Sequence, residues 1–184
     1  MKRTDLQRAP RARFAVLTQA VGIFLVAASS AAASPRTEVD LTGSGWRLWL
    51  DREAQWEHDE LFVPPVDLAR LPINPPTGGW SALASGFRDV AVPGTVEEYL
   101  HPGNGPSGDL KGVSWWIRRI KIPEANAPRR LLLRFDSVRL RAEVFVNQKL
   151  VGYDLVGNSP FEIDISGAVT PGSDCELAVR GHPE

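Results

Sequence analysis

The feature that most constrains this chain is a series of short segments in which apolar and polar side chains alternate. The pattern is clearest over 159–165, where Phe161, Ile163 and Ile165 are separated by acidic residues. Successive side chains of a β-strand point to opposite faces, so this period of two is typical of half-buried strands. It recurs over 131–136, 142–147 and 175–180. Turn residues separate these segments at intervals of roughly 8 to 12 residues, which predicts an antiparallel β-sandwich or barrel.

The first half of the chain shows the pattern less regularly. Residues 45–51 alternate well enough to predict a first strand, and 115–122 predicts another. Between them, 62–112 is rich in proline and glycine, which predicts mostly loop. No segment after Ala33 keeps a helical apolar stripe for more than about two turns. The predicted class is therefore all-β.

Residues 1–33 have the composition of a secretory signal peptide. Five basic residues precede or border an apolar run from Phe14 to Ala28, and small residues follow up to Ser34. We expect cleavage after Ala33 and a secreted or periplasmic product, with residues 34–184 forming one domain. The alternative is an uncleaved anchor, but the run of about 15 residues is shorter than the roughly 20 needed to cross a bilayer. We expect no membrane attachment after cleavage.

Charge and composition exclude several classes of function. Residues 1–33 hold five of the 21 basic and one of the 22 acidic side chains, so the remainder carries a net charge of about −5. An acidic domain is poorly suited to phosphate backbones, and we expect no nucleic-acid partner. One cysteine closes no intramolecular disulfide, and the three histidines match no metal-ligand spacing. We expect neither a metal nor a cofactor.

No catalytic constellation is visible in the sequence. The glycine–serine segments lack the spacing of a nucleophile elbow, and no phosphate-binding glycine loop occurs. Carboxylates are plentiful, but those on the predicted strands have the parity that we assign to solvent, where the ordinary role is solubility and edge protection. These are Glu143, Glu162, Asp164 and Glu176. We therefore name no catalytic residue.

Tryptophan is the residue type that most favours a carbohydrate ligand. The apolar face of a sugar ring stacks on an aromatic plane while a nearby Asn or Asp binds its hydroxyls. The alternative is a β-sandwich core, which we expect for Trp46 or Trp49 and for Trp116. Trp115 points to the opposite face from Trp116. Arg118 shares the inward parity of Trp116, so we expect it to have a carboxylate or aromatic partner.

Seven ordered motifs resemble the N-terminal sugar-binding domain of glycoside hydrolase family 2, the family of β-galactosidases, β-glucuronidases and β-mannosidases. A Val-Pro-Gly-Thr turn at 92–95 and a Trp-Trp-Ile-Arg strand at 115–118 open the series. The rest follow in the family's order over about 90 residues, a length at which the combination is specific although each motif alone is weak. They are 132–138, 142–147, 151–153, 159–165 and 176–180.

The resemblance implies a jelly-roll β-sandwich, a galactose-binding-domain-like fold. Family members hydrolyse glycosides with two glutamates on a later (β/α) barrel, which this chain lacks. It also stops before the family's closing segment, so we expect a sandwich that lacks its last strand or strands and a chain that is a fragment of a larger enzyme. Where the family often has Asn-Gly, this chain has Asn147-Gln148. Since Gln at positive φ costs roughly 1 kcal/mol, we expect a longer turn or another turn type.

The resemblance and the aromatic pattern together nominate three carbohydrate-binding residues, Asn104, Trp115 and Asp154. Asn104 lies in the loop that, in galactosidase-type relatives, reaches the catalytic pocket. An asparagine among glycines and prolines is also an ordinary turn residue. Asp154 stands in the loop after Gly152, where many relatives carry other residues.

The expected function is that of a non-catalytic domain that supports hydrolysis of O-glycosidic bonds once it is joined to a catalytic barrel. The expected partners are carbohydrate and that barrel, in the same or a neighbouring polypeptide. Two alternatives stay open. One is a self-standing secreted carbohydrate-binding or adhesion module, and the other is a remnant that does not fold stably.

Overall fold

A computed structural model describes residues 36–54, 67–100, 110–124 and 130–181. The chain divides into two units, residues 1–38 and Val39–Glu184, and the following concerns the second. Its elements are β1 (Gly43–Asp51), η2 (Leu68–Arg70), η3 (Trp80–Ala84), β2 (Arg88–Val92), α1 (Val96–Leu100), β3 (Val113–Lys121), β4 (Leu132–Phe135), β5 (Ala142–Val146), β6 (Lys149–Asp154), β7 (Phe161–Asp164) and β8 (Asp174–Gly181).

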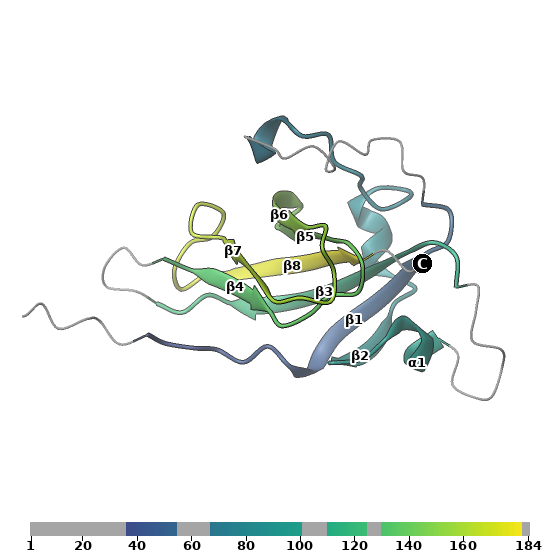
Figure 1. The fold of residues 1–184 in the computed structure, drawn as a ribbon, viewed down its shortest axis with the longest axis horizontal. Coiled ribbons are helices and arrows are strands. Elements are labelled where there is room, and N and C mark those ends of the chain that lie inside the picture. The colour runs from purple at the N-terminus through teal and green to yellow at the C-terminus, as the bar shows by residue number, and fades with distance from the viewer. Residues whose placement is uncertain (1–35, 55–66, 101–109, 125–129, 182–184) are drawn as a thin grey trace, which may run out of the picture. The chain divides into compact units, whose positions relative to one another are not determined.

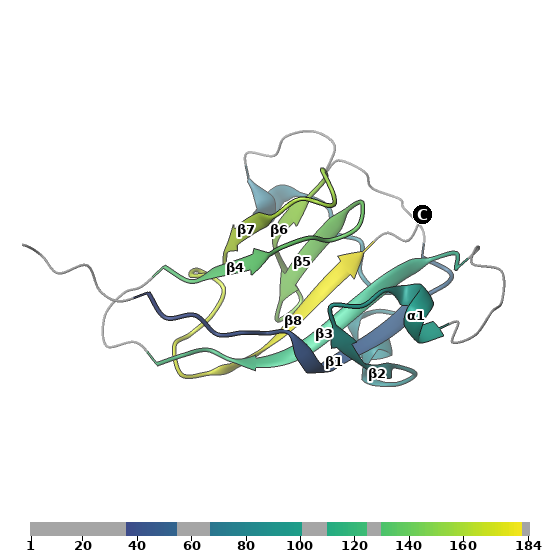
Figure 2. The same cartoon turned by 60° about the horizontal axis from the view of Figure 1, so that its bottom comes forward.

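The strands form two antiparallel sheets. The larger has six strands in the order β2-β1-β3-β8-β5-β6, and the smaller pairs β4 with β7. Figure 1 and Figure 2 show the β4–β7 pair lying over the larger sheet. This arrangement confirms the predicted β-sandwich. The structure also adds β2 and α1 within the stretch predicted to be mostly loop.

The first face of the six-stranded sheet packs against the β4–β7 pair and α1. Leu133 of β4 and Ile163 of β7 belong to the same buried cluster as Val144 and Leu177 of the larger sheet. Trp116 packs against this cluster together with the buried Ile120, as the strand parity predicts. The core between the two layers is therefore built by the alternating residues that the sequence singles out.

The second face of the six-stranded sheet is also buried. Here η3 brings Trp80 and Leu83 against the sheet, and Trp80 makes edge contacts with Trp115 and Phe145 at centroid distances of 5.5 and 5.1 Å. Leu68 and Leu71, around η2, pack on the same cluster. Residues of both parities along β3 and β5 are thus covered. Burial on both faces is the reason that β5 contains no exposed side chain.

The Val-Pro-Gly-Thr turn connects the edge strand β2 of the larger sheet to helix α1. Thr95 and Glu98 cap α1 reciprocally, since Thr95 N donates to Glu98 Oε2 at 2.7 Å and Glu98 N donates to Thr95 Oγ1 at 3.2 Å. The Tyr99 hydroxyl donates to Ala91 O at 2.6 Å and accepts from Ala91 N at 3.2 Å. A Cβ at Gly94 would lie 2.6 Å from this ring. Glycine therefore makes room for a tyrosine that occupies the backbone groups of edge strand β2.

The β5–β6 hairpin corrects one prediction. Val146 pairs with Lys149, and both intervening residues have positive φ, 47° at Asn147 and 67° at Gln148. This is a two-residue turn with the positive φ pair of type I′, not a longer turn. Asn147 Oδ1 accepts from Glu176 N at 2.9 Å, so an anchor on β8 helps to hold the turn.

We predict that Gln148→Gly raises the free energy of unfolding by about 1 kcal/mol, because glycine adopts the left-handed conformation without the penalty of a side chain. Chemical denaturation of both proteins measures the difference. Asn147→Gly is the matched control: it relieves the same kind of backbone strain but loses the hydrogen bond to β8, so we expect no gain. A Gln148→Gly variant that is no more stable than the parent would contradict the prediction.

Candidate functional site

Of the three predicted carbohydrate-binding residues, the structure places two. Asn104 lies outside the described residues. Asp154 ends β6, is half-buried, and its Oδ2 accepts from Gly157 N at 2.9 Å. Its carboxylate therefore already shapes the loop that follows β6.

Trp115 lies in the middle of the second-face core, and this corrects the expectation of an exposed tryptophan. It does point away from Trp116, as predicted, but its exposure is 0%. The ring is enclosed by Trp80 and Phe145, with Arg180 stacked at 6.0 Å from its centroid. A side chain covered on every side presents no plane on which a sugar ring stacks.

The structure does not bring Trp115 and Asp154 together. They lie on β3 and β6, which are separated by β8 and β5 in the sheet. The cross-strand register places Asp154 beside Ala142, a residue of the first-face core, whereas Trp115 belongs to the second face. The two residues therefore do not form one binding site on this sheet.

A buried charged row crosses the second face next to Trp115, and it overturns the prediction that Glu143 faces solvent. Tyr153, Glu143, Arg180 and Trp115 stand side by side on β6, β5, β8 and β3. Arg180 Nη1 donates to Glu143 Oε1 at 2.9 Å, and both side chains are 2% exposed. Arg141 Nη2 lies 3.5 Å from the same oxygen.

Burial is the dominant influence on the arginine of this row. It lowers the pKa of Arg180, and the neighbouring Glu143 carboxylate opposes that shift. Removing two opposite charges from water is unfavourable unless they remain paired. The row is thus a structural element. Sequence parity missed it because only the fold reveals that the second face is covered.

The covering segment is tied to the sheet by a second buried carboxylate. Asp51, at the end of β1, is 2% exposed, and its Oδ2 accepts from Thr77 N at 2.8 Å. Thr77 precedes η3, which carries Trp80 onto the sheet. A short polar anchor therefore accompanies the aromatic contacts that close the second face.

Arg118 has the aromatic partner expected for it. Its guanidinium lies 5.7 Å from the centroid of Trp46, and its Nη1 donates to the backbone oxygens of Leu41 and Thr42. Trp46 Nε1 donates to the same Leu41 oxygen at 2.7 Å. These contacts fasten the segment before β1 to β3, which is a structural role.

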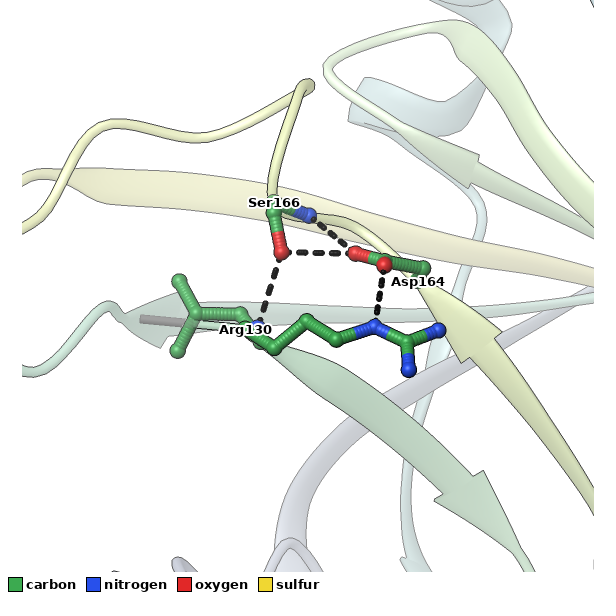
Figure 3. Close-up of polar contacts among 4 residues, drawn as sticks. Arg130, Asp164 and Ser166 are labelled. Carbon is green, nitrogen blue, oxygen red and sulfur yellow. Dashed lines mark hydrogen bonds and ion pairs between the residues drawn. The ribbon is translucent and has the colours of Figure 1, made fainter. Parts of the chain in front are cut away.

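An exposed polar cluster joins the start of β4 to the end of β7 (Figure 3). Arg130 Nε donates to Asp164 Oδ2 at 2.8 Å, and Ser166 donates to Asp164 Oδ1 through its hydroxyl at 2.6 Å and its backbone N at 3.0 Å. Leu131 N donates to Ser166 Oγ at 2.8 Å. The Ser166 hydroxyl, the Arg130 guanidinium and the Ser166 amide lower the pKa of Asp164 to about 2. Such a carboxylate stays ionised and is unsuited to act as an acid near neutral pH.

We predict that Asp164 titrates near pH 2 and that Ser166→Ala moves its pKa upward, since the largest stabilising hydrogen bond is lost. Because the folded pKa lies below the ordinary value of 3.8, the contribution to stability is present above pH 4 and declines as the pH falls toward 2. Carboxyl chemical shifts followed by NMR measure both values. Ser173→Ala, which removes a serine bound to Thr170 O, should leave the Asp164 pKa unchanged.

The described residues contain neither a metal-binding cluster nor a membrane-spanning helix. No group of three or more His, Cys, Asp or Glu side chains among these residues is arranged to hold a metal ion. Within the same ranges, no helix is both long and apolar enough to cross a membrane.

Comparison with known proteins identifies relatives among glycoside-cleaving enzymes. Two curated relatives are a β-glucuronidase of Formosa agariphila, 26% identical over 95 residues, and a β-galactosidase of Thermoanaerobacter pseudethanolicus, 29% identical over 89 residues. These alignments cover 51% and 48% of this chain but only 9% and 12% of the relatives. The chain therefore spans a small part of the curated relatives that it matches.

Solved structures show the same relation. The β-glucuronidase of Lactobacillus rhamnosus is 25% identical with a TM-score of 0.55, covering 82% of this chain and 23% of that one. That of Faecalibacterium prausnitzii has a TM-score of 0.52 at 22% identity, covering 81% and 22%. The resemblance inferred from the sequence motifs is thus confirmed at the level of fold. The family model described as glycosyl hydrolases family 2, sugar binding domain, matches residues 79–181, more than half of the chain, and the chain belongs to that family.

Proposed function

We propose that this chain is the N-terminal, non-catalytic sugar-binding domain of a family 2 glycoside hydrolase and that it supports hydrolysis of O-glycosidic bonds when joined to a catalytic barrel. The observation that carries the proposal is the match of residues 79–181 to the family's sugar-binding domain, on a sandwich that aligns with about a fifth of β-glucuronidase chains. In the family 2 enzymes this domain accompanies a catalytic barrel.

The geometry favours a structural role in the enzyme over a catalytic one. Glu143 lies in the buried ion pair with Arg180, and Asp164 is held ionised by Ser166 and Arg130. A glycosidase needs one carboxyl group that keeps its proton and a second one across the scissile bond. Asp164 does not meet the first requirement. Glu143 is 2% exposed and paired with Arg180, so a substrate does not reach it.

Sugar contacts, in this proposal, come from the loops at the ends of the strands. Asn104 and Asp154 remain the candidates. Trp115 does not contribute a sugar contact, because its ring is completely buried. This burial also removes the tryptophan on which a self-standing carbohydrate-binding module would have depended.

The test has two parts. The purified chain, given nitrophenyl β-glucuronide, β-galactoside and β-mannoside, should show no turnover. A chimera in which residues 39–184 replace the matching domain of the Lactobacillus rhamnosus β-glucuronidase should hydrolyse the glucuronide at least tenfold faster than the same enzyme with that domain deleted. Turnover by the isolated chain that a point substitution abolishes, or a chimera no faster than the deleted enzyme, would contradict the proposal.

We also propose that the protein is exported. The support is the basic N-terminal stretch followed by the apolar run 14–28 and the small residues up to Ser34. Expression of the full chain in a bacterial host, with mass spectrometry of the exported fraction, should give a product that begins at Ser34. Intact protein retained in the cytoplasm would contradict export.

A further inference from the structure

Two loops at one end of the sandwich are joined to each other. One is the β4–β5 loop, residues 136–141, and the other is the β6–β7 loop, residues 155–160 (Figure 2). Asn158 N donates to Val138 O at 2.8 Å, which links them directly. Phe135 and Phe161, which border the loops, stack with their centroids 4.7 Å apart and their planes 8° apart. The two loops therefore form one unit with a shared aromatic base.

The backbone of this unit is tightly constrained. Gly157 has a φ of 65°, and a Cβ there would lie 2.4 Å from Leu140 O, so only glycine fits. Leu140 has a φ of 59° and Asn158 one of 54°. A leucine in the left-handed region costs of order 1–3 kcal/mol, and such strain persists only where the surroundings hold it in place. The loops thus hold Leu140 in one unfavourable but fixed conformation.

The same unit carries aliphatic side chains in solvent. Leu140 is 42% exposed, Leu155 36% and Val156 78%. They are half of the six large apolar side chains that are exposed among the residues the structure describes. Single exposed apolar residues are ordinary. Leu155 and Val156 are neighbours in the chain, and the backbone of Leu140 lies against Gly157, so the three fall within one unit, and such grouping is typical of an interaction surface. We call these three side chains the two-loop patch.

The chemistry of the patch favours a protein over a sugar. Branched aliphatic side chains offer no flat aromatic plane for a pyranose, whereas they do fill depressions in an apolar protein surface. The chain covers only 22–23% of two β-glucuronidase chains of its own fold, so most of such an enzyme lies outside this domain. The large neighbour that a family 2 sugar-binding domain accompanies is the catalytic barrel.

We propose that the two-loop patch is the surface on which the catalytic barrel docks. The inference rests on the proposed function and adds the contact surface to it. The constrained backbone at Leu140 then has a role: it fixes the direction in which the side chain leaves the loop, so less backbone freedom is lost on docking. Gly157 serves the same surface because the absence of a Cβ lets the two loops approach each other.

The first experiment compares thiol labelling in the free chain and in the chimera with the Lactobacillus rhamnosus enzyme. Val156→Cys should react with a maleimide reagent at least tenfold more slowly in the chimera. Val39→Cys, at another exposed valine (57%), should change less than twofold. The native Cys175 is buried and provides the background rate, measured without either substitution. Equal labelling of Val156→Cys in the free chain and in an active chimera would overturn the proposal.

The second experiment places charge on the patch. Leu155→Asp with Val156→Asp should lower the chimera's glucuronide hydrolysis at least tenfold. Val156→Asp alone, at the position that is 78% exposed, should also lower it while leaving the thermal unfolding of the free chain unchanged. Val39→Asp should leave the activity within twofold. A chimera that is inactive without any substitution would contradict the proposed function itself. An active chimera that keeps its hydrolysis rate with both aspartates would contradict only the docking surface.

Discussion

Glu143→Ala is expected to destabilise the protein by about 3–5 kcal/mol, the range seen when one partner of a buried ion pair is removed. The substitution leaves the guanidinium of Arg180, itself 2% exposed, without the carboxylate 2.9 Å away, and it also removes the oxygen that faces Arg141. Urea denaturation followed by tryptophan fluorescence measures the loss. A change below about 1 kcal/mol, the scale of an exposed pair, would show that the row is not buried in solution.

A double substitution separates charge from packing in this row. Glu143→Leu together with Arg180→Met removes both charges and keeps apolar volume, and such replacements are often neutral. We expect the double variant to be more stable than Glu143→Leu alone by about 1–3 kcal/mol, since both variants lose the Glu143 oxygen that faces Arg141 and differ only in the charge of Arg180. If the two single losses simply add, the pair is not coupled and the assignment of the row fails.

The second large effect is expected at Trp115. Trp115→Ala should cost about 3–5 kcal/mol, because it empties a fully enclosed site and deprives Trp80 and Phe145 of their aromatic neighbour. Trp116→Ala, on the same strand but only partly buried, is the matched control and should cost less. The comparison is made by denaturation of the two variants under one set of conditions.

This result bears directly on how sugar binding is tested. If Trp115→Ala loses binding, unfolding is a sufficient explanation. A Trp115→Ala variant that keeps the parent's stability yet loses affinity for a glycan would contradict the buried placement and would indicate that Trp115 contacts the sugar.

The sequence predicted the strands well where one face dominates the pattern. Alternation located β4, β5, β7 and β8 to within one or two residues because their inward side chains form the first-face core. It failed for Glu143, since parity identifies a second face but does not say what covers it. The cover comes from η2 and η3, in a proline-rich stretch without a periodic signal.

The candidate site was less predictable than the fold. The sequence patterns point to Trp115 and Asp154 independently, and only the strand order reveals that they lie on separated strands and opposite faces of the sheet. The two-loop patch could not be predicted from the sequence, because it depends on the close approach of Leu140 and Gly157, residues 17 positions apart. Local patterns do not encode such a contact.

The double coverage of the six-stranded sheet has a consequence for its fluctuations. β3 and β8 lie at its centre. Each is hydrogen-bonded to a strand on either side, and both of its faces are covered by packed side chains. Amide protons of Ile117 and Ala178, which pair across these strands, should exchange with deuterium only when the whole domain opens. Amide protons of β2, an outer strand, should exchange through local opening at a lower free energy. The exchange rates of the Ile117 and Ala178 amides therefore report the global free energy of unfolding.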